Sequence, residues 1–505
     1  MRKFSSRFSI GSLPEIFVSD ASISKAVFEA VAHGQLRKLG SRLYTRNLDE
    51  DPERLVRRNW YHLITSYYPD ALITDRTALE NQPAADGSVC LISNKKRDIV
   101  LPGLVFRPRK GPEPLDSDRT FIGGARLAST ARAYLENMRL SRTRGTRLPR
   151  TLSREEIETR LDNLIRQNGE DALNRLRDEA CAIATPLGLE QEFQEFIDLV
   201  GTLLGTRDAK LKSPAALSRA AGRPFDPDRI RLFETLFAAL RETVPTLRSV
   251  QQQTAGANTN LAFFEAYFSN FIEGTEFTVK EAEEIVFGGV IPPQRPDDAH
   301  DILGTFRIVS DEADMQTLAT DFMEFLKLLR HRHATIMSAR LEKSPGNFKT
   351  RINRAGNTIF VAPDLVIGTL EQGFAFLEAL ADPFERAVFM MFLVSEVHPF
   401  ADGNGRIARV MMNAELVAGT QQRIIVPTGY RIDYLTALKA MSQSSLAPPL
   451  IRMMNRAQQY THAIKWDDLE IAQKMLEQSG AFEEGQDAKL KMPDELTARS
   501  STTLL

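Results

Sequence analysis

Apolar residues recur at helical spacing along most of the chain, and alternation of apolar and polar residues is confined to a few short stretches. Apolar positions three and four residues apart predict amphipathic helices, whereas strict alternation predicts half-buried strands. Between residues 152 and 254 one helical pattern follows another, and Ser153 with Glu156 has the sequence of a capping box at the first of them. The pattern therefore predicts a mainly α protein with few, short strands.

The first 137 residues are the exception, because they mix short helices with extended stretches. Asp20 is a candidate N-cap for a helix that continues to Ala32. Residues 35–44 then alternate apolar and polar side chains around a Gly-Ser pair, which predicts a β-hairpin with basic outward side chains. A short helix followed by a basic hairpin is typical of a winged helix, so we expect a winged-helix-like α+β domain over residues 1–137.

Breaks in the pattern divide the rest of the chain. Five arginines between residues 139 and 150, interrupted by Gly145 and Pro149, predict a flexible basic linker. This linker opens a helical connecting region over residues 138–255, and the main helical domain follows over residues 256–465. Residues 466–505 combine one charged helix with a polar tail of the composition typical of disorder.

Composition narrows the possible classes of protein. The length of 505 residues suits about three domains, and 43% apolar with 26% charged residues is the mixture of a soluble globular protein. The net charge of −2 excludes a uniformly basic nucleic-acid coat, so contact with nucleic acid would need a local patch. Two cysteines cannot support a disulfide framework, and no apolar run is long enough to span a bilayer. We therefore expect a cytoplasmic protein with no membrane partner.

The residue types that carry chemistry gather between His398 and Arg409. Pro399 ends an apolar helix that begins near Pro383, and a second helix is predicted to begin at Arg406. The unpaired N–H groups and the positive dipole end of that second helix would face the glycine-containing turn between the two helices. The stretch therefore predicts an anion site built from backbone.

Side chains around this turn suggest three roles. Arg406 and Arg409 are three residues apart, so they share a helix face and can both address phosphate oxygens. Asp402 offers a carboxylate oxygen of the kind that Mg²⁺ prefers, and His398 can accept a proton near neutral pH. An anion site, a metal ligand, two arginines and a base predict transfer of a nucleotidyl or phosphoryl group to a nucleophile that must lose a proton.

Residues 398–409, HPFADGNGRIAR, resemble the signature of the Fic (Fido) family at every defined position, and the resemblance extends over about residues 256–460. It implies an all-helical core with a small β-hairpin flap. It also implies transfer of AMP from ATP to a Ser, Thr or Tyr hydroxyl of a target protein, with Mg²⁺ as cofactor and self-modification as one outcome. A donor other than ATP, such as UTP, stays open.

The same resemblance implies a role for each residue of the stretch. His398 would be the general base, and Asp402 would hold Mg²⁺. The phosphates of the nucleotide would be bound by Gly403, Asn404, Gly405, Arg406 and Arg409. Tyr434 lies where the family commonly places an aromatic residue near the adenine, although core packing explains this tyrosine equally well.

A second motif of the family lies upstream. Residues 269–274, SNFIEG, match its inhibitory pattern, which marks the second class of the family when it precedes the core. Ser269 and Glu273 are four residues apart and share a helix face. The resemblance implies that Glu273 pairs with Arg409 and withholds the guanidinium from the γ-phosphate. An exposed glutamate on a C-terminal turn is the plain alternative.

Residues 347–352 and 358–361 predict two short strands joined by a turn at Ala355-Gly356-Asn357. In the family such a flap binds an extended target segment by adding a strand. A purely structural hairpin is an equal alternative. His331 and His333 are two residues apart and point to different sides of a helix, which predicts a poor metal pair.

Residues 1–137 are similar, more loosely, to the winged-helix region of AbiEi-type antitoxins, which bind their own operators. Basic side chains of the hairpin region could contact DNA phosphates or simply be solvated: Arg37, Lys38, Arg42 and Arg46. Three hypotheses therefore stand. The first and favoured is an autoinhibited protein adenylyltransferase, the second a DNA-binding antitoxin-like regulator whose core senses nucleotide, and the third an enzyme that removes AMP while Glu273 orients water.

Overall fold

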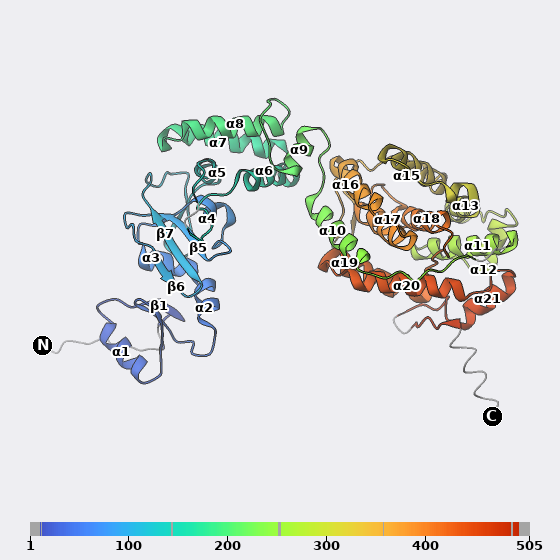
Figure 1. Cartoon of the computed structure of the whole chain (residues 1–505), viewed down its shortest axis with the longest axis horizontal. Coiled ribbons are helices and arrows are strands. Elements are labelled where there is room, and N and C mark those ends of the chain that lie inside the picture. The colour runs from blue at the N-terminus through green and yellow to red at the C-terminus, as the bar shows by residue number, and fades with distance from the viewer. Residues whose placement is uncertain are drawn as a thin grey trace. The chain divides into compact units, whose positions relative to one another are not determined.

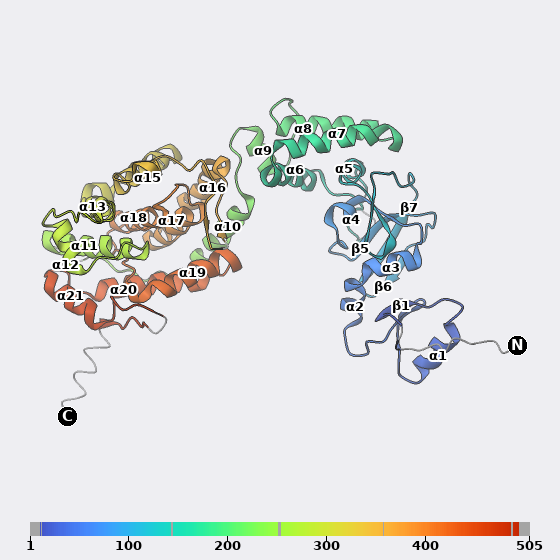
Figure 2. The same cartoon turned by 180° about the vertical axis from the view of Figure 1, so that it is seen from behind.

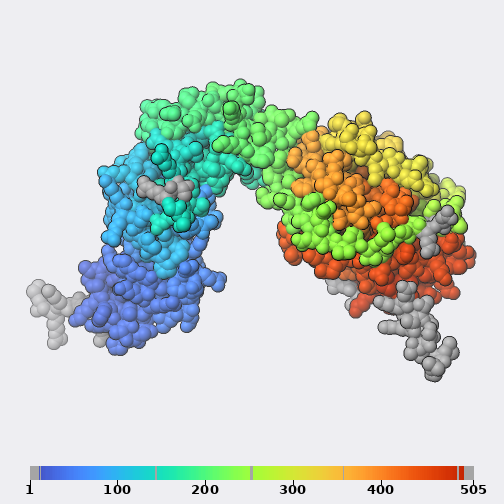
Figure 3. All heavy atoms as spheres, viewed as in Figure 1, coloured from blue at the N-terminus to red at the C-terminus, as the bar shows by residue number. Residues whose placement is uncertain are grey.

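The computed structural model describes residues 11, 13–142, 145–250, 254–356, 358–485 and 488–493. Contacts between Cα atoms divide the chain into two compact units, Met1–Ala221 and Gly222–Leu505. Figures 1 and 2 show the elements from opposite sides, and Figure 3 shows all heavy atoms. Helices outnumber strands and the strands are short, which confirms the predicted mainly α class. Among the described residues no helix is long and apolar enough to cross a bilayer.

A small three-stranded sheet opens the first unit. Helix α1 (Ser24–Ala32) precedes the hairpin of β2 (Arg37–Gly40) and β3 (Leu43–Thr45), and β1 (Ile16–Val18) pairs antiparallel with β3. The predicted helix and hairpin are therefore both present. The predicted cap is different, because Asp20 Oδ1 accepts the N–H groups of Ser22 and Ile23 in the turn before α1, whose N-cap is Ile23.

A mixed six-stranded sheet follows, in the order β6-β7-β5-β4-β9-β8. Its strands are β4 (Leu72–Ile73), β5 (Ser88–Ile92), β6 (Ile99–Leu101), β7 (Leu104–Arg109), β8 (Arg119–Thr120) and β9 (Arg126–Leu127). The neighbouring strands β5 and β7 run parallel, and β4 pairs antiparallel with β5. The helices of this part are α2 (Pro52–Arg58), α3 (Trp60–Tyr67), α4 (Asp75–Glu80) and α5 (Thr130–Met138). Apolar side chains from the sheet and from α2 and α3 form its core.

Four further helices complete the first unit: α6 (Arg154–Asn168), α7 (Glu170–Leu187), α8 (Glu190–Leu203) and α9 (Pro214–Ala220). The predicted capping box is confirmed, since Ser153 Oγ accepts the Glu156 N–H and the Glu156 carboxylate accepts the Ser153 N–H. The arginine-rich segment between α5 and α6 is not a free linker. Leu148 donates its N–H to Asp86, and the Arg150 guanidinium donates to the Arg107 carbonyl at 2.6 Å, so the segment is held against the sheet.

The second unit is a helical bundle around α17 (Pro383–Val397) and α18 (Asn404–Ala418), which pack against each other. Helix α17 is buried on nearly all sides, as its apolar run predicts, and Asp382 caps its N-terminus. The surrounding helices are α10 (Pro227–Arg241), α11 (Ala255–Ile272), α12 (Val279–Val286), α13 (Pro296–Ser310), α14 (Glu312–Gln316), α15 (Phe322–Ile336), α16 (Val366–Glu378), α19 (Arg431–Ser444), α20 (Ala447–Ala463) and α21 (Leu469–Gln478). Helix α18 contacts α11, α13, α14 and α15, and α17 contacts α10 and α16.

The predicted flap is present in a shorter form. Strands β10 (Arg354–Ala355) and β11 (Thr358–Ile359) pair antiparallel, and Asn357 of the predicted turn lies outside the described residues. The prediction of a strand over residues 347–352 is wrong. Phe348 makes only an isolated bridge with Phe400, and Lys349 donates its N–H to the Pro399 carbonyl, so this backbone bonds to the turn after α17 and not to β11.

Candidate active site

The turn between α17 and α18 is rigidly built. His398 and Gly403 both adopt left-handed backbone conformations, with φ of 53° and 72°. The Asn404 side chain accepts the Phe400 N–H at 2.8 Å and donates to the Phe400 carbonyl at 2.9 Å, which closes the turn on itself. Helix α18 begins at Asn404, two residues before the predicted start at Arg406. Its first N–H groups have no intrahelical acceptor, so the geometry suits the predicted backbone anion site, and binding of an anion there stays a prediction.

His398 is positioned to accept a proton. Its Nδ1 lies 3.2 Å from the Ser395 carbonyl oxygen, and because a carbonyl only accepts, Nδ1 carries the hydrogen and Nε2 has a free lone pair. Burial lowers the pKa of His398 to about 4, so the ring is neutral at pH 7. Phe360, which follows β11, stacks on the imidazole with ring centroids 3.7 Å apart. The flap therefore covers the predicted base.

His333 supports the same turn, and sequence reasoning missed it because it was considered only as a metal ligand. Its Nδ1 accepts the Gly346 N–H, so its Nε2 carries the hydrogen and donates to the Asp402 carbonyl at 2.9 Å. The ring also stacks on Phe400 with centroids 3.6 Å apart. Burial lowers the pKa of His333 to about 4. A second proton would have to point at the Gly346 N–H, so this arrangement requires a neutral ring.

These two histidines predict that the second unit loses stability in mild acid. The unfolded chain binds protons on both rings below about pH 6.5, whereas the folded chain binds them only near pH 4. The free energy of unfolding should therefore fall by about 2 kcal/mol per histidine between pH 7 and pH 5.

The chain has two tryptophans, and Trp60→Phe would leave Trp466 as the reporter of the second unit in urea titrations. A His333→Gln variant should be less stable at pH 7 but should show a smaller loss between pH 7 and pH 5. An equal loss in both chains would contradict the assignment of acid sensitivity to His333.

Asp402 has one carboxylate oxygen engaged and one available. Its Oδ1 accepts the Gly403 N–H at 2.7 Å, and its Oδ2 lies 3.9 Å from the Lys343 ammonium. The side chain is 43% exposed. Among the described residues no group of three or more His, Cys, Asp or Glu could hold a metal ion. A single exposed carboxylate fits Mg²⁺, which is commonly bound by one or two carboxylates together with substrate phosphates.

The Arg406 guanidinium is held by an ion pair and also lies near the turn, with its Nη2 4.0 Å from Asp402 Oδ1. Its Nη1 lies 2.6 Å from Asp301 Oδ2 on α13, and the side chain is 4% exposed. Asp301 also binds Arg340 at 2.8 Å. The guanidinium of Arg406 is thus engaged in a buried ion pair that joins α13 to α18, and contact with phosphate stays a prediction. Sequence reasoning missed Asp301, because nothing in the local pattern distinguishes it from other acidic residues of α13.

Arg409 is paired as the inhibitory motif implies. Its Nη2 lies 2.7 Å from Glu273 Oε1 and 2.8 Å from the Ser269 carbonyl, and its Nε donates to Ser269 Oγ at 3.0 Å. Glu273 also lies close over the first turn of α18, since a Cβ added at Gly405 would be 2.1 Å from Glu273 Oε1. The glutamate carboxylate therefore lies beside the first turn of α18, next to the predicted anion site.

Tyr434 lies in the core beside Arg409, and its ring centroid is 6.0 Å from the guanidinium carbon. Its side chain is fully buried, and its hydroxyl lies 3.6 Å from Met391 Sδ. This placement agrees with core packing, and contact with adenine stays a prediction.

The basic side chains of the N-terminal hairpin mostly bond to neighbouring backbone. Arg37 donates to the Leu48 and Glu50 carbonyls, Arg42 to the Ser19 carbonyl and Arg46 to the Gly11 carbonyl. Lys38 is exposed and makes no side-chain hydrogen bond within the described part of the chain. Contact of this hairpin with DNA stays a prediction.

Comparisons with known proteins match a family model to one segment of the second unit. The model of the Fic/DOC family matches residues 324–416. The chain is similar to the protein adenylyltransferases fic-1 of Caenorhabditis briggsae and Caenorhabditis elegans, each 24% identical over 37% of this chain. It spans only 38% of the length of these curated relatives.

Solved structures give a more distant likeness. That of Fic-1 from C. elegans has a TM-score of 0.36 and 15% identity, over 64% of this chain and 98% of that chain. Residues 324–416 contain α17, the His398–Arg409 turn and most of α18. They are a domain of the Fic/DOC family.

Proposed function

We propose that this chain is an autoinhibited protein adenylyltransferase, which transfers AMP from ATP to a side-chain hydroxyl of a target protein. The observation that carries the proposal is the pairing of a neutral His398, whose Nε2 is free to accept a proton, with the N-terminus of α18 in the same turn. The similarity to relatives that are named protein adenylyltransferases supports it. The target can include the chain itself.

Each residue of the turn would have a separate role in the reaction. The N–H groups at Gly403, Asn404 and Gly405 would bind phosphate oxygens of ATP, and Arg409 would bind the outer phosphates. Asp402 would hold Mg²⁺, which supplies positive charge to the triphosphate when bound. His398 Nε2 would accept the hydroxyl proton of the target while the hydroxyl oxygen attacks the α-phosphorus. A bond from oxygen to the α-phosphorus forms, the bond to the bridging oxygen breaks, and pyrophosphate leaves with its electron pair.

Inhibition follows from the position of Glu273. Its carboxylate lies over the anion site and binds Arg409, so it competes with the phosphates for both partners. We propose that this contact is the resting state and that its release activates transfer. We also propose a cytoplasmic location, which is supported by Cys90 and Cys181, both free thiols.

The test uses ATP labelled either at the α-phosphate or at the γ-phosphate. The Glu273→Gly chain, incubated with Mg²⁺ and candidate target proteins, should incorporate the α-label and not the γ-label. Incorporation of the γ-label would show phosphoryl transfer and would overturn the proposal. Mass spectrometry of the product identifies the modified hydroxyl, and parallel reactions with UTP, CTP and GTP identify the preferred donor. Loss of label from a modified protein added at the start would instead show removal of AMP.

A further inference from the structure

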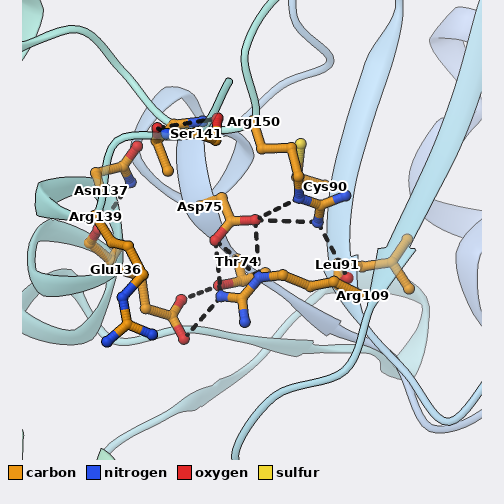
Figure 4. A network of polar contacts seen from close by, with 12 residues as sticks. Thr74, Asp75, Cys90, Leu91, Arg109, Glu136, Asn137, Arg139, Ser141 and Arg150 are labelled. Carbon is orange, nitrogen blue, oxygen red and sulfur yellow. Dashed lines mark hydrogen bonds and ion pairs between the residues drawn. The ribbon is translucent and has the colours of Figure 1, made fainter. Parts of the chain in front are cut away.

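A cluster of charged side chains lies in the first unit, at one edge of the six-stranded sheet (Figure 4). Asp75 follows β4, Arg109 ends β7, and Arg150 comes from the segment that returns to the sheet before α6. Figure 4 shows the Asp75 carboxylate between the two guanidinium groups. Its Oδ1 lies 2.8 Å from Arg109 Nη2, and its Oδ2 lies 3.0 Å from Arg150 Nη2. One buried carboxylate thus orients two arginines.

The backbone at Asp75 is strained in order to place this carboxylate. Its φ is 52°, in the left-handed region that residues other than glycine rarely adopt, although the residue begins helix α4. Strained backbone of this kind persists where the surrounding structure fixes it, and it is concentrated at functional sites. Glu136 on α5 fixes the cluster from the other side, since its carboxylate lies 3.3 Å from Arg109 and 3.1 Å from Arg132.

Beside this cluster lies a cavity of about 600 Å³ with a basic lining. Six of its nine lining residues are cationic and one is acidic: Lys96, Arg107, Arg109, Arg142, Arg147 and Arg150, with Asp98. A second cavity of about 380 Å³ shares Arg109, Ser141 and Arg150 with it. The oriented guanidiniums of Arg109 and Arg150 therefore form part of the wall of both cavities.

The positive charge of the larger cavity is not balanced by its own carboxylates. Asp98 forms an ion pair with Arg147 at 2.9 Å. Asp75 forms ion pairs with both Arg109 and Arg150. Arg107 is 5% exposed and donates only to neutral oxygens, those of Ser88 and Leu148. Lys96 and Arg142 are exposed and form no side-chain hydrogen bond or ion pair with the residues that the structure describes. Two of the six cations, Lys96 and Arg142, thus lack a carboxylate partner within the described residues, whereas Arg107 interacts electrostatically with Asp86.

We infer that this cavity in the first unit binds a small phosphorylated compound. Like charges held together in a confined space repel one another, and an anion with several negative oxygens relieves that repulsion. Arginine presents several donors in a planar fork that suits phosphate oxygens, and the volume lies within the range of about 300–1,000 Å³ typical of small-molecule sites. This inference is independent of the function proposed for the second unit.

The burial of two of the lining arginines favours a small ligand over a nucleic acid. Arg107 and Arg150 lie at the back of the cavity, with 5% of Arg107 and 18% of the Arg150 side chain exposed. A free phosphorylated molecule is small enough to enter the cavity, whereas the backbone of a duplex would contact only the exposed rim residues Lys96 and Arg142. We therefore assign the rim residues to capture of the ligand and the deep arginines to its orientation.

Calorimetric titration of the full chain with inorganic pyrophosphate, in buffer without Mg²⁺, tests this inference. The double variant Lys96→Ala/Arg142→Ala should bind pyrophosphate at least 10-fold more weakly, since it loses two charged donors of the rim. The matched control is Arg54→Ala/Arg57→Ala on α2, which removes the same charge from exposed residues that form no ion pair within the described residues. Its affinity should equal that of the unmodified chain. Pyrophosphate bound at α18 would remain in both variants, so their difference reports the cavity alone.

Parallel titrations use single-stranded and double-stranded DNA. The inference would be overturned if pyrophosphate bound equally well to both double variants. It would also be overturned if pyrophosphate bound neither to these variants nor to the unmodified chain. The inference would also be overturned if only DNA bound and its binding depended on Lys96 and Arg142, because the surface would then be a nucleic-acid contact. A single Arg142→Lys variant should retain most of the affinity for pyrophosphate, because it keeps the positive charge that the Lys96→Ala/Arg142→Ala variant removes.

Discussion

Replacing His398 with alanine is expected to reduce AMP transfer by about 10²- to 10⁴-fold, the range that a positioned general base contributes. The physical reason is the single free lone pair at Nε2. The Ser395 carbonyl fixes the hydrogen on Nδ1, and burial keeps the ring neutral at pH 7, so Nε2 is ready to accept the hydroxyl proton. The rate should be measured as incorporation of α-labelled AMP in chains that also carry Glu273→Gly, so that basal transfer is high enough to follow its loss.

The control for this variant separates chemistry from binding. His398→Ala should bind ATP with nearly unchanged affinity, because in the proposed mechanism the phosphates are bound by the N-terminus of α18 and by Arg409. A His398→Asn side chain can donate to the Ser395 carbonyl but has no basic nitrogen, so it should be as slow as His398→Ala. Transfer at more than a tenth of the parent rate in both variants would show that another group accepts the proton.

The local geometry of the candidate site could be predicted because its residues are consecutive. The turn from His398 to Arg409 contains the helix end, the glycine and the next helix N-terminus within twelve residues, and local geometry brings them together. The pairing of Glu273 with Arg409, which is distant in the sequence, is predicted only through the family motif. In the structure it reaches Arg409, 136 residues further along the chain.

The supporting residues could not be predicted, because their contacts are long-range and have no spacing signal. His333 reaches the Asp402 carbonyl 69 residues away, and Asp301 on α13 holds Arg406 on α18. The six-stranded sheet was seen only as extended stretches, since three of its strands have two residues each and cannot show a period. The arginines before α6 predict a linker from the sequence alone, because the carboxylates that hold Arg147 and Arg150, Asp98 and Asp75, lie far away along the chain.

Replacing Glu273 with glycine is expected to increase AMP transfer by about 10- to 100-fold, which corresponds to the loss of one charge-assisted hydrogen bond of about 1.5–3 kcal/mol from the resting state. The carboxylate is 31% exposed, so partial screening by water places the effect below that of a fully buried pair. Glu273→Gln should release part of the inhibition, because the amide keeps the volume over Gly405 but loses the charge that binds Arg409. Rates of α-label incorporation at saturating ATP measure both variants.

The arrangement around Arg409 explains why this release should activate the site and not disorder it. Ser269 holds the guanidinium through its carbonyl and its hydroxyl, so Arg409 keeps two oxygen contacts when Glu273 is removed. The two hydrogen bonds between Asn404 and Phe400 that close the turn do not involve Glu273. The matched control is Glu276→Gly, an exposed glutamate three residues further along the same loop. If Glu276→Gly raised transfer as much as Glu273→Gly, activation would come from general loss of negative charge, and the pairing with Arg409 would not be the inhibitory contact.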